Sequence, residues 1–420
     1  METLLPPGIH NPSNYCYIIS TIQCLKNLKS IRKFINHNSK FDQIVTAFLN
    51  GYGLKVMNKE NFIKQIEKIE ESIKNKDENV LAVKNQIIKQ LQISESNFNW
   101  FLNKIKHNNT NMYMYFAFLN LVKKLYSQKN TVLDMNEFIT IFRIVSVDNG
   151  NQYLSMGQND ASEFLVFLID YFHEGHTING TFTSNGMDID KSDEQIVSMP
   201  LSDRIRIGFH KHFKLSLKDN YTSLIPDIHH YILNMITCSS CGYANLSYSM
   251  ENILCLSLYQ KDNKNETLSI YDTLDKHFED EELEGYCCDK CKNKESNKMS
   301  KMLLTNPDTF IICLKRTGYN PDTMGMEKIN VKVEYPMMIN LNKYYPKYMN
   351  SLGTEGIYKL SGVVNQVGDN NFGHYFSYVY DDNLDKWLCC NDEKINIMDE
   401  VNVLNSNNAY LLFYQKNTDN

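Results

Sequence analysis

The residue types that make up an activated cysteine nucleophile lie far apart in this sequence: Cys16, His374 and the adjacent pair Asn391 and Asp392. A thiol attacks a carbonyl carbon when an imidazole within hydrogen-bond reach takes its proton and a third group orients that imidazole. His374 is the best candidate base, because Gly373 before it lets a ligand approach the backbone and a strand-like segment follows it. We therefore expect nucleophilic thiol chemistry, provided that the fold brings these residues together.

The segment NPSNYCYIISTIQCLKNL, residues 11–28, decides the setting of Cys16. Asn14 is a favourable helix N-cap residue. Apolar residues then recur at the spacing of one helix face: Ile18, Ile19, Ile22, Leu25 and Leu28. This pattern predicts a helix with Cys16 in its first turn, where unpaired N–H groups and the helix dipole favour a thiolate. Position alone also allows a buried structural cysteine.

Two kinds of segment would position these residues. Helical apolar spacing occurs in a Lys/Glu/Asn-rich region at about 58–109, which we interpret as an exposed extra helical region, and again at 111–127 and 159–172. Segments rich in β-branched and aromatic residues, typical of strands, follow at 309–316, 329–336, 358–367, 374–381 and 409–416. A helical half followed by a β half indicates an α+β fold, with a cleft between the halves.

Bulk composition excludes several classes of protein. With 420 residues, 42% of them hydrophobic, the chain can bury a sizeable core. A net charge of −6 gives no basic surface for nucleic acid, so we expect none as a partner. The N-terminus does not resemble a secretory signal, and the longest apolar stretch, 112–122, is too short for a membrane span. We expect an intracellular protein, cytoplasmic or nuclear, that does not bind a membrane.

Eleven cysteines in such a chain are better explained as thiols, metal ligands or a nucleophile than as disulfides. Two CxxC pairs, Cys238/Cys241 and Cys288/Cys291, could form a tetrahedral zinc site with four sulfur ligands, although Cys287 leaves the second pair ambiguous by one residue. We expect the remaining cysteines, apart from Cys16, to serve packing. Two histidine pairs are also candidate metal ligands: His173 and His176, and His210 and His212. Neither pair has the HExxH spacing of a metal site, so we expect these histidines at the surface.

The segment GIHNPSNYCYIISTIQCL around Cys16 resembles the cysteine box of the ubiquitin-specific proteases, which are papain-like cysteine deubiquitinases. GQNDASEFLVFLID is similar to the acidic helix segment of that family, and GHYFSYVYDDNLDKWLCCND to its histidine box. PDTFIICLKR and KINVKVEYP resemble two of its strand motifs. These motifs occur in the family order and extend from Gly8 to Tyr414, so the resemblance covers almost the whole chain.

The resemblance implies a single catalytic domain, 1–420, with a papain-like α+β fold. A helical thumb would occupy 1–185, including the extra helical region, and a β palm 186–420, with a zinc-bearing finger ribbon at about 230–300. The family spacing Y-x-C-x-x-C, matched by Tyr286, selects Cys288 over Cys287. Structural Zn²⁺ would then be bound by Cys238, Cys241, Cys288 and Cys291, unless the finger has lost its metal.

The resemblance also implies roles for the site residues. Cys16 would attack the carbonyl of the last glycine of ubiquitin, His374 would transfer the proton, and the Asn11 amide would donate to the developing oxyanion. Counting four residues from Trp387 gives Asn391 as the residue that orients His374, with Asp392 on the opposite side of an extended strand and able to assist. Residues expected to bind substrate are Asp160, Glu163, Gly373 and Tyr375.

Several residues depart from the family pattern without removing a catalytic group: Ser13, Tyr15, Ile19, Asn159 and Thr317. We therefore expect a monomeric thiol-dependent hydrolase, with ubiquitin and ubiquitinated proteins as partners. Two alternatives stay open at this point. One is a protease for another ubiquitin-like modifier, and the other is a catalytically silent scaffold that binds ubiquitin, which would be expected to have lost one of the catalytic residues.

Overall fold

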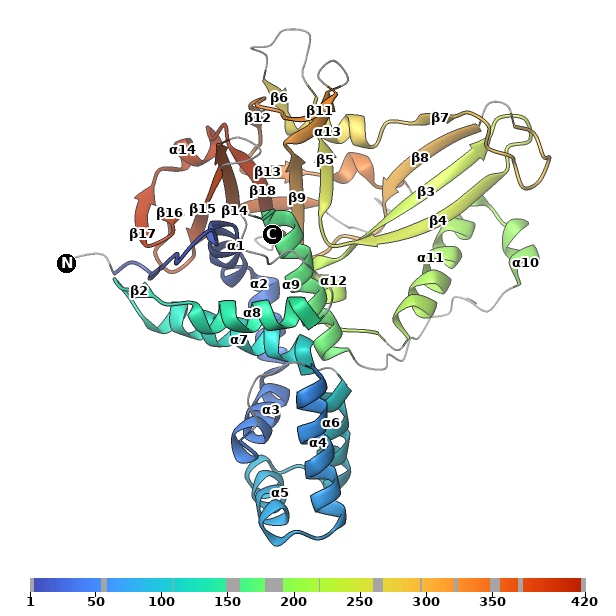
Figure 1. Cartoon of the computed structure of the whole chain (residues 1–420). Coiled ribbons are helices and arrows are strands. Elements are labelled where there is room, and N and C mark those ends of the chain that lie inside the picture. Colours follow the sequence, from blue (N-terminus) through green and yellow to red (C-terminus); the bar gives the residue numbers. More distant parts are fainter. Residues whose placement is uncertain are drawn as a thin grey trace. The chain divides into compact units, whose positions relative to one another are not determined.

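The computed structural model describes residues 4–53, 59–107, 109–148, 159–177, 192–218, 220–259, 267–294, 297–320, 324–347, 356–368 and 373–416. The chain divides into two compact units. Figure 1 labels their helices and strands. Unit 1 consists of Met1–Lys26, Ile31–His176 and Cys390–Asn396. Unit 2 consists of Asn27–Ser30, Thr177–Cys389 and Ile397–Asn420. The expected thumb boundary near residue 185 lies outside the described residues.

Unit 1 is mainly helical. Outside the extra helical region, its helices are α1 (Cys16–Lys26), α2 (Lys29–His37), α3 (Ser39–Gly51), α7 (Asn109–Ser127), α8 (Asn136–Asp148) and α9 (Ala161–His176). Helix α7 packs on α8 and α9, and α1 packs on α9. The rings of Tyr17 and Phe164 meet edge to face at 5.8 Å between centroids, so α1 is held against the apolar face of α9 that the sequence predicted. A short parallel pair, β1 (Gly8–Ile9) and β2 (Val132–Leu133), precedes α1 and α8 in the chain.

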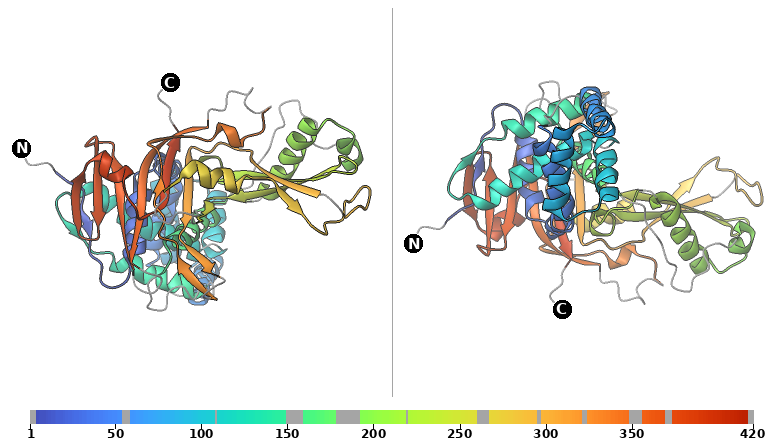
Figure 2. Two further views of the ribbon diagram at one scale, coloured as in Figure 1. Left: turned by 90° about the horizontal axis from the view of Figure 1, so that it is seen from above. Right: turned by 90° about the horizontal axis from the view of Figure 1, so that it is seen from below.

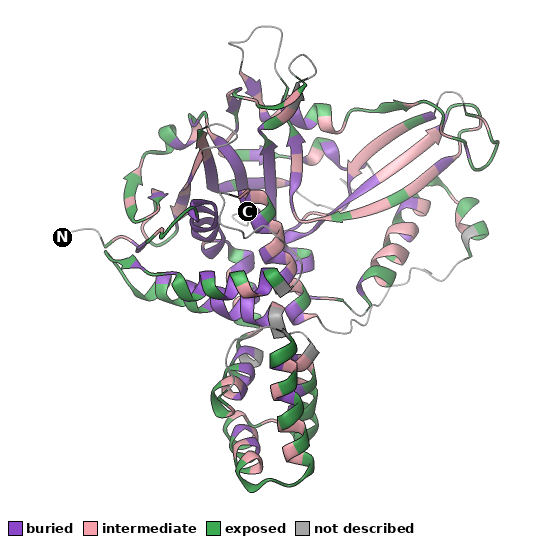
Figure 3. Cartoon of the chain, viewed as in Figure 1, coloured by how far each residue is buried: buried purple, intermediate pink, exposed green. Residues whose placement is uncertain are grey.

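The extra helical region consists of α4 (Lys59–Lys74), α5 (Glu78–Leu91) and α6 (Glu95–His107). These helices pack on one another and on α3 and α7. The Phe98 ring lies 4.5 Å from that of Phe48 on α3, and the outward faces are largely exposed (Figure 3). Lys84 is buried, contacts Glu95 and lies 5.6 Å from the centre of the Phe98 ring. The region therefore shares an apolar core with α3 and α7.

The main sheet of unit 2 is built from strands that are distant in sequence: β5 (Leu254–Ser257), β9 (Thr309–Lys315), β18 (Ala409–Lys416), β14 (Ile357–Gly368), β15 (Gly373–Asp381) and β16 (Lys386–Asn391). They are adjacent in that order, and β13 (Met338–Asn340) also pairs with β14. The strands predicted at 309–316, 358–367, 374–381 and 409–416 are confirmed. The segment 329–336 is a strand only at β12 (Val333–Glu334), which pairs with β6 (Leu268–Ser269).

Smaller elements complete unit 2: α13 (Ile270–His277), β10 (Thr317–Asn320), β11 (Gly325–Lys328), a 3₁₀ turn (Asn342–Tyr344) and α14 (Glu400–Leu404). Helix α13 packs on β5, and its Ile270 and Leu274 are part of the apolar core of the main sheet. Strand β17 (Lys394–Met398) pairs with β16 as the edge strand of the main sheet, and the turn between them belongs to unit 1. Among the described residues, no helix combines the length and the apolar character that a membrane span requires.

A second sheet of unit 2 is formed by β4 (Ala244–Glu251), β3 (His230–Cys238), β8 (Asn297–Leu303) and β7 (Glu281–Leu283), in this antiparallel order. Helix α11 (Leu201–Leu217) packs along β4, as both views in Figure 2 show. The short helices α10 (Asp193–Val197) and α12 (Leu224–Ile228) flank it in sequence. The sequence predicted a β half from residue 186 onward, so the helical segment before β3 corrects that expectation.

One of the histidines expected at the surface is buried. His176, at the end of α9, is 6% exposed and packs edge to face against Phe34 and Tyr115. Its Nδ1 lies 3.0 Å from the carbonyl oxygen of Phe172, one turn earlier in the same helix. The prediction was wrong because HEGH ends an amphipathic helix whose apolar face carries His176 into the core.

Candidate functional site

Cys16 is the first residue of α1 and is 4% exposed. The carbonyl oxygen of Tyr15 accepts the N–H groups of Ile18 and Ile19 at 3.0 Å, so Tyr15 is the N-cap residue. The sequence predicted Asn14 as the N-cap residue, but the N-cap residue is Tyr15, one position later. The structure confirms the predicted place of Cys16 in the first turn of the helix.

Asn11 organises the loop that leads to Cys16. Its Oδ1 accepts the backbone N–H groups of Ser13 and Tyr15, both at 3.2 Å, which fixes the orientation of the side-chain amide. Its Nδ2 donates to Oδ2 of Asp392 at 3.2 Å. Asn11, Asp392 and the start of α1 are thus connected within unit 1, although Asn11 and Asp392 are 381 positions apart in sequence.

The turn that carries Asp392 differs from the extended strand that the sequence predicted. Asp392 has a left-handed backbone with φ +48°, which few residues other than glycine adopt. Its backbone oxygen accepts the N–H of Ile9 at 2.9 Å. Its Oδ1 is buried and has no hydrogen-bond partner among the described residues. Asn391 is exposed and ends β16, and the side chain of Asp392 binds Asn11 in the loop before Cys16.

Tyr15, which stands where the family pattern has threonine, is held by an arginine that the sequence did not single out. Nη2 of Arg143 on α8 contacts the Tyr15 hydroxyl, and its guanidinium carbon lies 5.6 Å from the centre of the Tyr15 ring. Tyr15 is 9% exposed. The substitution is therefore accommodated by packing and a charge-assisted hydrogen bond. No local sequence signal connects these two residues.

Asp160 and Glu163, expected to bind substrate, lie at the start of α9 and have different surroundings. Oδ1 of Asp160 accepts the backbone N–H and the hydroxyl of Ser162 at 2.7 and 2.6 Å, and the N–H of Glu163 at 3.3 Å. Asp160 thus caps the helix. Glu163 is exposed, and partial burial together with the Asp160 charge raises the pKa of its carboxyl group.

His374 lies in unit 2, as the second residue of β15, and is half-buried. It pairs in register with Val367 of β14, and Gly373 pairs with Gly368. The next residue, Tyr375, is buried, and its hydroxyl accepts a hydrogen bond from Nε2 of Gln366 at 3.0 Å. The strand pair thus fixes the backbone on both sides of the imidazole. Tyr375 anchors the strand from inside, whereas the sequence implied that it binds substrate.

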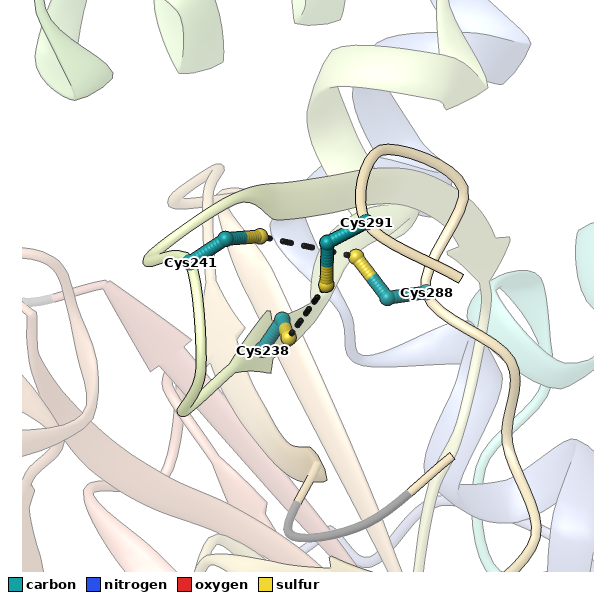
Figure 4. Close-up of side chains that lie close together, drawn as sticks. All are labelled: Cys238, Cys241, Cys288 and Cys291. Carbon is teal, nitrogen blue, oxygen red and sulfur yellow. Dashed lines mark hydrogen bonds between the residues drawn. The ribbon is translucent and has the colours of Figure 1, made fainter. Parts of the chain in front are cut away.

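The four cysteines predicted to bind a metal form a cluster in unit 2 (Figure 4). Their sulfur atoms all lie within 4.8 Å of one another. Sγ of Cys238 is 3.6 Å from that of Cys291, and Sγ of Cys241 is 3.7 Å from that of Cys288. Four thiol groups at this spacing could hold a metal ion. Cys287 is exposed and is not part of this cluster, which agrees with the choice of Cys288.

The two halves of the cysteine cluster share one backbone geometry. In each, the N–H of the first cysteine bonds to the carbonyl five residues on, Tyr243 in one and Asn293 in the other. The carbonyl of that cysteine then accepts the N–H of Gly242 or Lys292. Gly242 and Lys292 occupy the same place and are both left-handed, with φ +68° and +61°. Two matching turns therefore present two thiol groups each, an arrangement suited to a tetrahedral ion.

A comparison with known protein families identifies the family of this chain. The sequence model of the family described as ubiquitin carboxyl-terminal hydrolase matches residues 7–414. The chain belongs to this family. The match includes every predicted site residue, from Asn11 to Asp392.

Relatives of this hydrolase-family chain are longer proteins. Ubiquitin carboxyl-terminal hydrolase 44 of Ailuropoda melanoleuca is 30% identical over 291 residues, which cover 63% of this chain and 37% of the relative. Ubiquitin carboxyl-terminal hydrolase 5 of Saccharomyces cerevisiae is 25% identical over 279 residues, which cover 63% of this chain and 33% of the relative. The chain thus spans about a third of the length of these relatives.

Solved structures show the fold of this hydrolase-family chain. The SAGA Ubp8/Sgf11/Sus1/Sgf73 DUB module bound to ubiquitin aldehyde contains a similar chain, with a TM-score of 0.60 and 18% identity, covering 99% of this chain and 70% of that one. The fold is therefore the α+β papain-like fold of the ubiquitin-specific proteases, as the sequence predicted.

Proposed function

We propose that this hydrolase-family chain is a thiol-dependent enzyme that cleaves the peptide or isopeptide bond after the C-terminal glycine of ubiquitin. The observation that carries the proposal is the arrangement in unit 1. Cys16 starts a helix, and the preceding loop is fixed through Asn11, which Asp392 binds at 3.2 Å. A silent scaffold would have no need of a helix-start thiol preceded by a loop with an oriented amide donor.

In the proposed reaction, Cys16 attacks the glycine carbonyl and its proton passes to His374. The tetrahedral intermediate then expels the amine, which takes the proton from the imidazole. Water next attacks the thioester, with His374 again as the base, and releases ubiquitin and the thiol. Asn391 would orient the imidazole by accepting its second N–H.

Asn11 would stabilise the oxyanion that forms in both steps. Its amide is already oriented by the N–H groups of Ser13 and Tyr15, so little reorganisation is needed when charge develops. Removing one such donor typically costs about 3–4 kcal/mol of transition-state stabilisation. Asp392 would help by holding the same amide from the other side.

We infer that α9 and β15 each supply residues that contact the ubiquitin tail. Asp160 is engaged in capping α9, so Glu163, which is exposed, is the better placed of the two carboxylates to pair with a basic side chain of the tail. Gly373, half-buried before His374, would allow close approach of the substrate backbone. Tyr375, being buried, would support the strand.

We also propose that Cys238, Cys241, Cys288 and Cys291 bind one structural Zn²⁺. The matched turns and the sulfur spacing support this choice of metal and ligands. The ion would join the β3–β4 turn to the segment before β8, and it would take no part in the reaction. Because thiolate ligands and a thiol nucleophile need reducing conditions, we infer an intracellular site of action, in the cytoplasm or nucleus.

The test is turnover of ubiquitin that carries a fluorogenic C-terminal amide. We expect the wild type to release the fluorophore and Cys16→Ala to lose this activity with an unchanged circular dichroism spectrum. Ubiquitin with an electrophilic C-terminus should label Cys16 in the wild type. Labelling by another ubiquitin-like modifier instead would assign that modifier as the substrate. Undiminished turnover by Cys16→Ala would refute the proposal.

A further inference from the structure

Three consecutive residues of the N-terminal segment lie against the turn that carries Asp392. Gly8 lies so close to Glu393 that an added Cβ atom would come within 2.0 Å of the Glu393 backbone oxygen. The N–H of Ile9 donates to the backbone oxygen of Asp392 at 2.9 Å. Nδ1 of His10 lies 2.5 Å from Oε1 of Glu393, a short hydrogen bond between side chains. All of these residues belong to unit 1.

The His10–Glu393 pair is exposed, with 52% and 49% of the two side chains accessible. Exposed ion pairs usually contribute little to stability, so a role in overall stability does not explain it. Its position is more informative. His10 precedes Asn11, and Glu393 follows Asp392, so the pair lies beside the Asn11–Asp392 hydrogen bond. The two side-chain contacts together connect the loop before Cys16 to the turn.

The His10–Glu393 pair lies where it can stabilise the unusual backbone conformation of Asp392. Its left-handed backbone is unfavourable for an L side chain and persists only when surrounding contacts fix it. Loss of the Glu393 contact would let the turn relax toward commoner conformations. Asn11 would then lose the acceptor at 3.2 Å that orients its Nδ2.

We propose that His10 and Glu393 are positioning residues that hold Asp392, and through it the Asn11 amide, in the geometry that the reaction at Cys16 requires. The inference rests on the proposed function for its catalytic part. Asn11 would interact with charge that exists only in the transition state, so loss of the pair lowers kcat rather than raising KM.

The contact depends on a donor at the position of Nδ1, which a neutral or a protonated imidazole can supply. The side-chain amide of asparagine places a donor at a similar distance from the backbone, whereas leucine has none. His10→Leu should therefore lower kcat about fivefold to tenfold, with KM changed less than twofold, and His10→Asn should restore at least half of the wild-type value.

Glu393→Ala should match His10→Leu, and the double variant should be no slower than either single variant, because both remove the same contact. The matched control is Glu60→Ala, which breaks an exposed pair on α4, where Nζ of Lys64 lies 2.6 Å from Oε1 of Glu60. That variant should keep the wild-type kcat. Melting temperatures within about 3 °C of the wild type would show that all variants are folded.

Hydrogen–deuterium exchange gives a readout that does not depend on activity. The N–H of Ile9, bonded to Asp392, should exchange faster in His10→Leu and Glu393→Ala, and at the wild-type rate in Glu60→Ala. Unchanged exchange in both variants would refute the positioning contact. Faster exchange with unchanged kcat would refute its catalytic role. A wild type without hydrolase activity would refute the proposed function, and the exchange rates would still decide whether His10 and Glu393 hold the turn.

Discussion

At the scale of single residues, the position of Asp392 distinguishes its role from that of Asn391, which the sequence alone could not do. The spacing from Trp387 predicts that Asn391 orients His374 and that Asp392 assists. In the structure, Oδ2 of Asp392 binds Asn11. Asp392 is thus connected to the amide donor, whereas the role of Asn391 stays a prediction. A period-two strand pattern could not foresee the left-handed turn that changes where Asp392 points.

We therefore predict different kinetic effects for the two residues. Asn391→Ala should lower kcat/KM at least tenfold, about 1.4 kcal/mol, because the imidazole loses its orienting acceptor. It should also change the pH profile of kcat/KM, since the protonation of the base is affected. Asp392→Ala should lower kcat about tenfold without changing the shape of that profile, because it acts through Asn11. Steady-state kinetics between pH 6 and 9 would measure both, and an altered profile in Asp392→Ala alone would reverse the assignment.

Acid stability should depend on His230, which is fully buried beside Phe310 with ring centroids 4.8 Å apart. Burial, and then the neighbouring His229 and His277, lower the pKa of His230 from 6.5 to about 3. The unfolded chain binds more protons between these values, so the free energy of unfolding falls as the pH drops below 6.5. At pH 5 the loss due to this residue should be about 2 kcal/mol relative to pH 8.

Urea denaturation of the wild type and His230→Phe at pH 8 and pH 5 would measure this dependence. Phenylalanine cannot be protonated and keeps the aromatic contact with Phe310, so the variant should lose less stability on acidification. His212→Phe, a substitution in the half-buried part of α11, is the control. An equal pH dependence in the wild type and His230→Phe would show that other groups control acid unfolding.

At the scale of elements, the sequence predicted those whose own residues carry the signal. Strand β9 (Thr309–Lys315) and strand β14 (Ile357–Gly368) are rich in apolar residues suited to a buried sheet, and both were found within two residues of their ends. Helix α11 was missed, although Ile205, Phe209 and Phe213 recur at the spacing of one helix face. The many charged residues and histidines of α11 made this apolar pattern hard to recognise. The three apolar side chains pack on β3 and β4.

The cysteine cluster leads to a prediction about zinc content. Protein expressed with sufficient zinc should contain about one equivalent of Zn²⁺, and Cys238→Ser should contain much less, because one of four thiolate ligands is gone. The matched control is Cys287→Ser, since Cys287 is adjacent to Cys288 but outside the cluster. Elemental analysis would measure both variants. Equal zinc loss in both, or no zinc in the wild type, would contradict the choice of ligands.

At the scale of the whole molecule, the division into units depends on contacts that no local pattern records. The segment 390–396, from the end of β16 to the start of β17, belongs to unit 1, although the residues on both sides of it belong to unit 2. Contacts such as that between Ile9 and Asp392 join positions almost the whole chain apart. The motif order of the family indicated that both ends of the chain contribute to one site. It could not indicate which atoms meet, because that depends on the turn conformation.

The two units should also respond separately to perturbation. In unit 1, Phe98 is fully buried against Phe48, so Phe98→Ala should lower the free energy of unfolding by about 3–5 kcal/mol. The control is Trp100→Ala on the same helix, where the side chain is 48% exposed, so the change should be smaller than that of Phe98→Ala. If unit 1 opens as its own cooperative unit, Phe98→Ala should speed amide exchange in α3 and α6 and leave β3 and β8 unchanged.

Zinc removal should give the opposite pattern. A chelator takes the ion from the cysteine cluster, which joins the end of β3 to the segment before β8, so protection should fall in those two strands. Amides of α3 and α6 should exchange at their original rates, because no ligand of the cluster lies in unit 1. Exchange that rises in both units after either treatment would mean that the chain unfolds as one cooperative unit, with the cores of the helical and β parts stabilising each other.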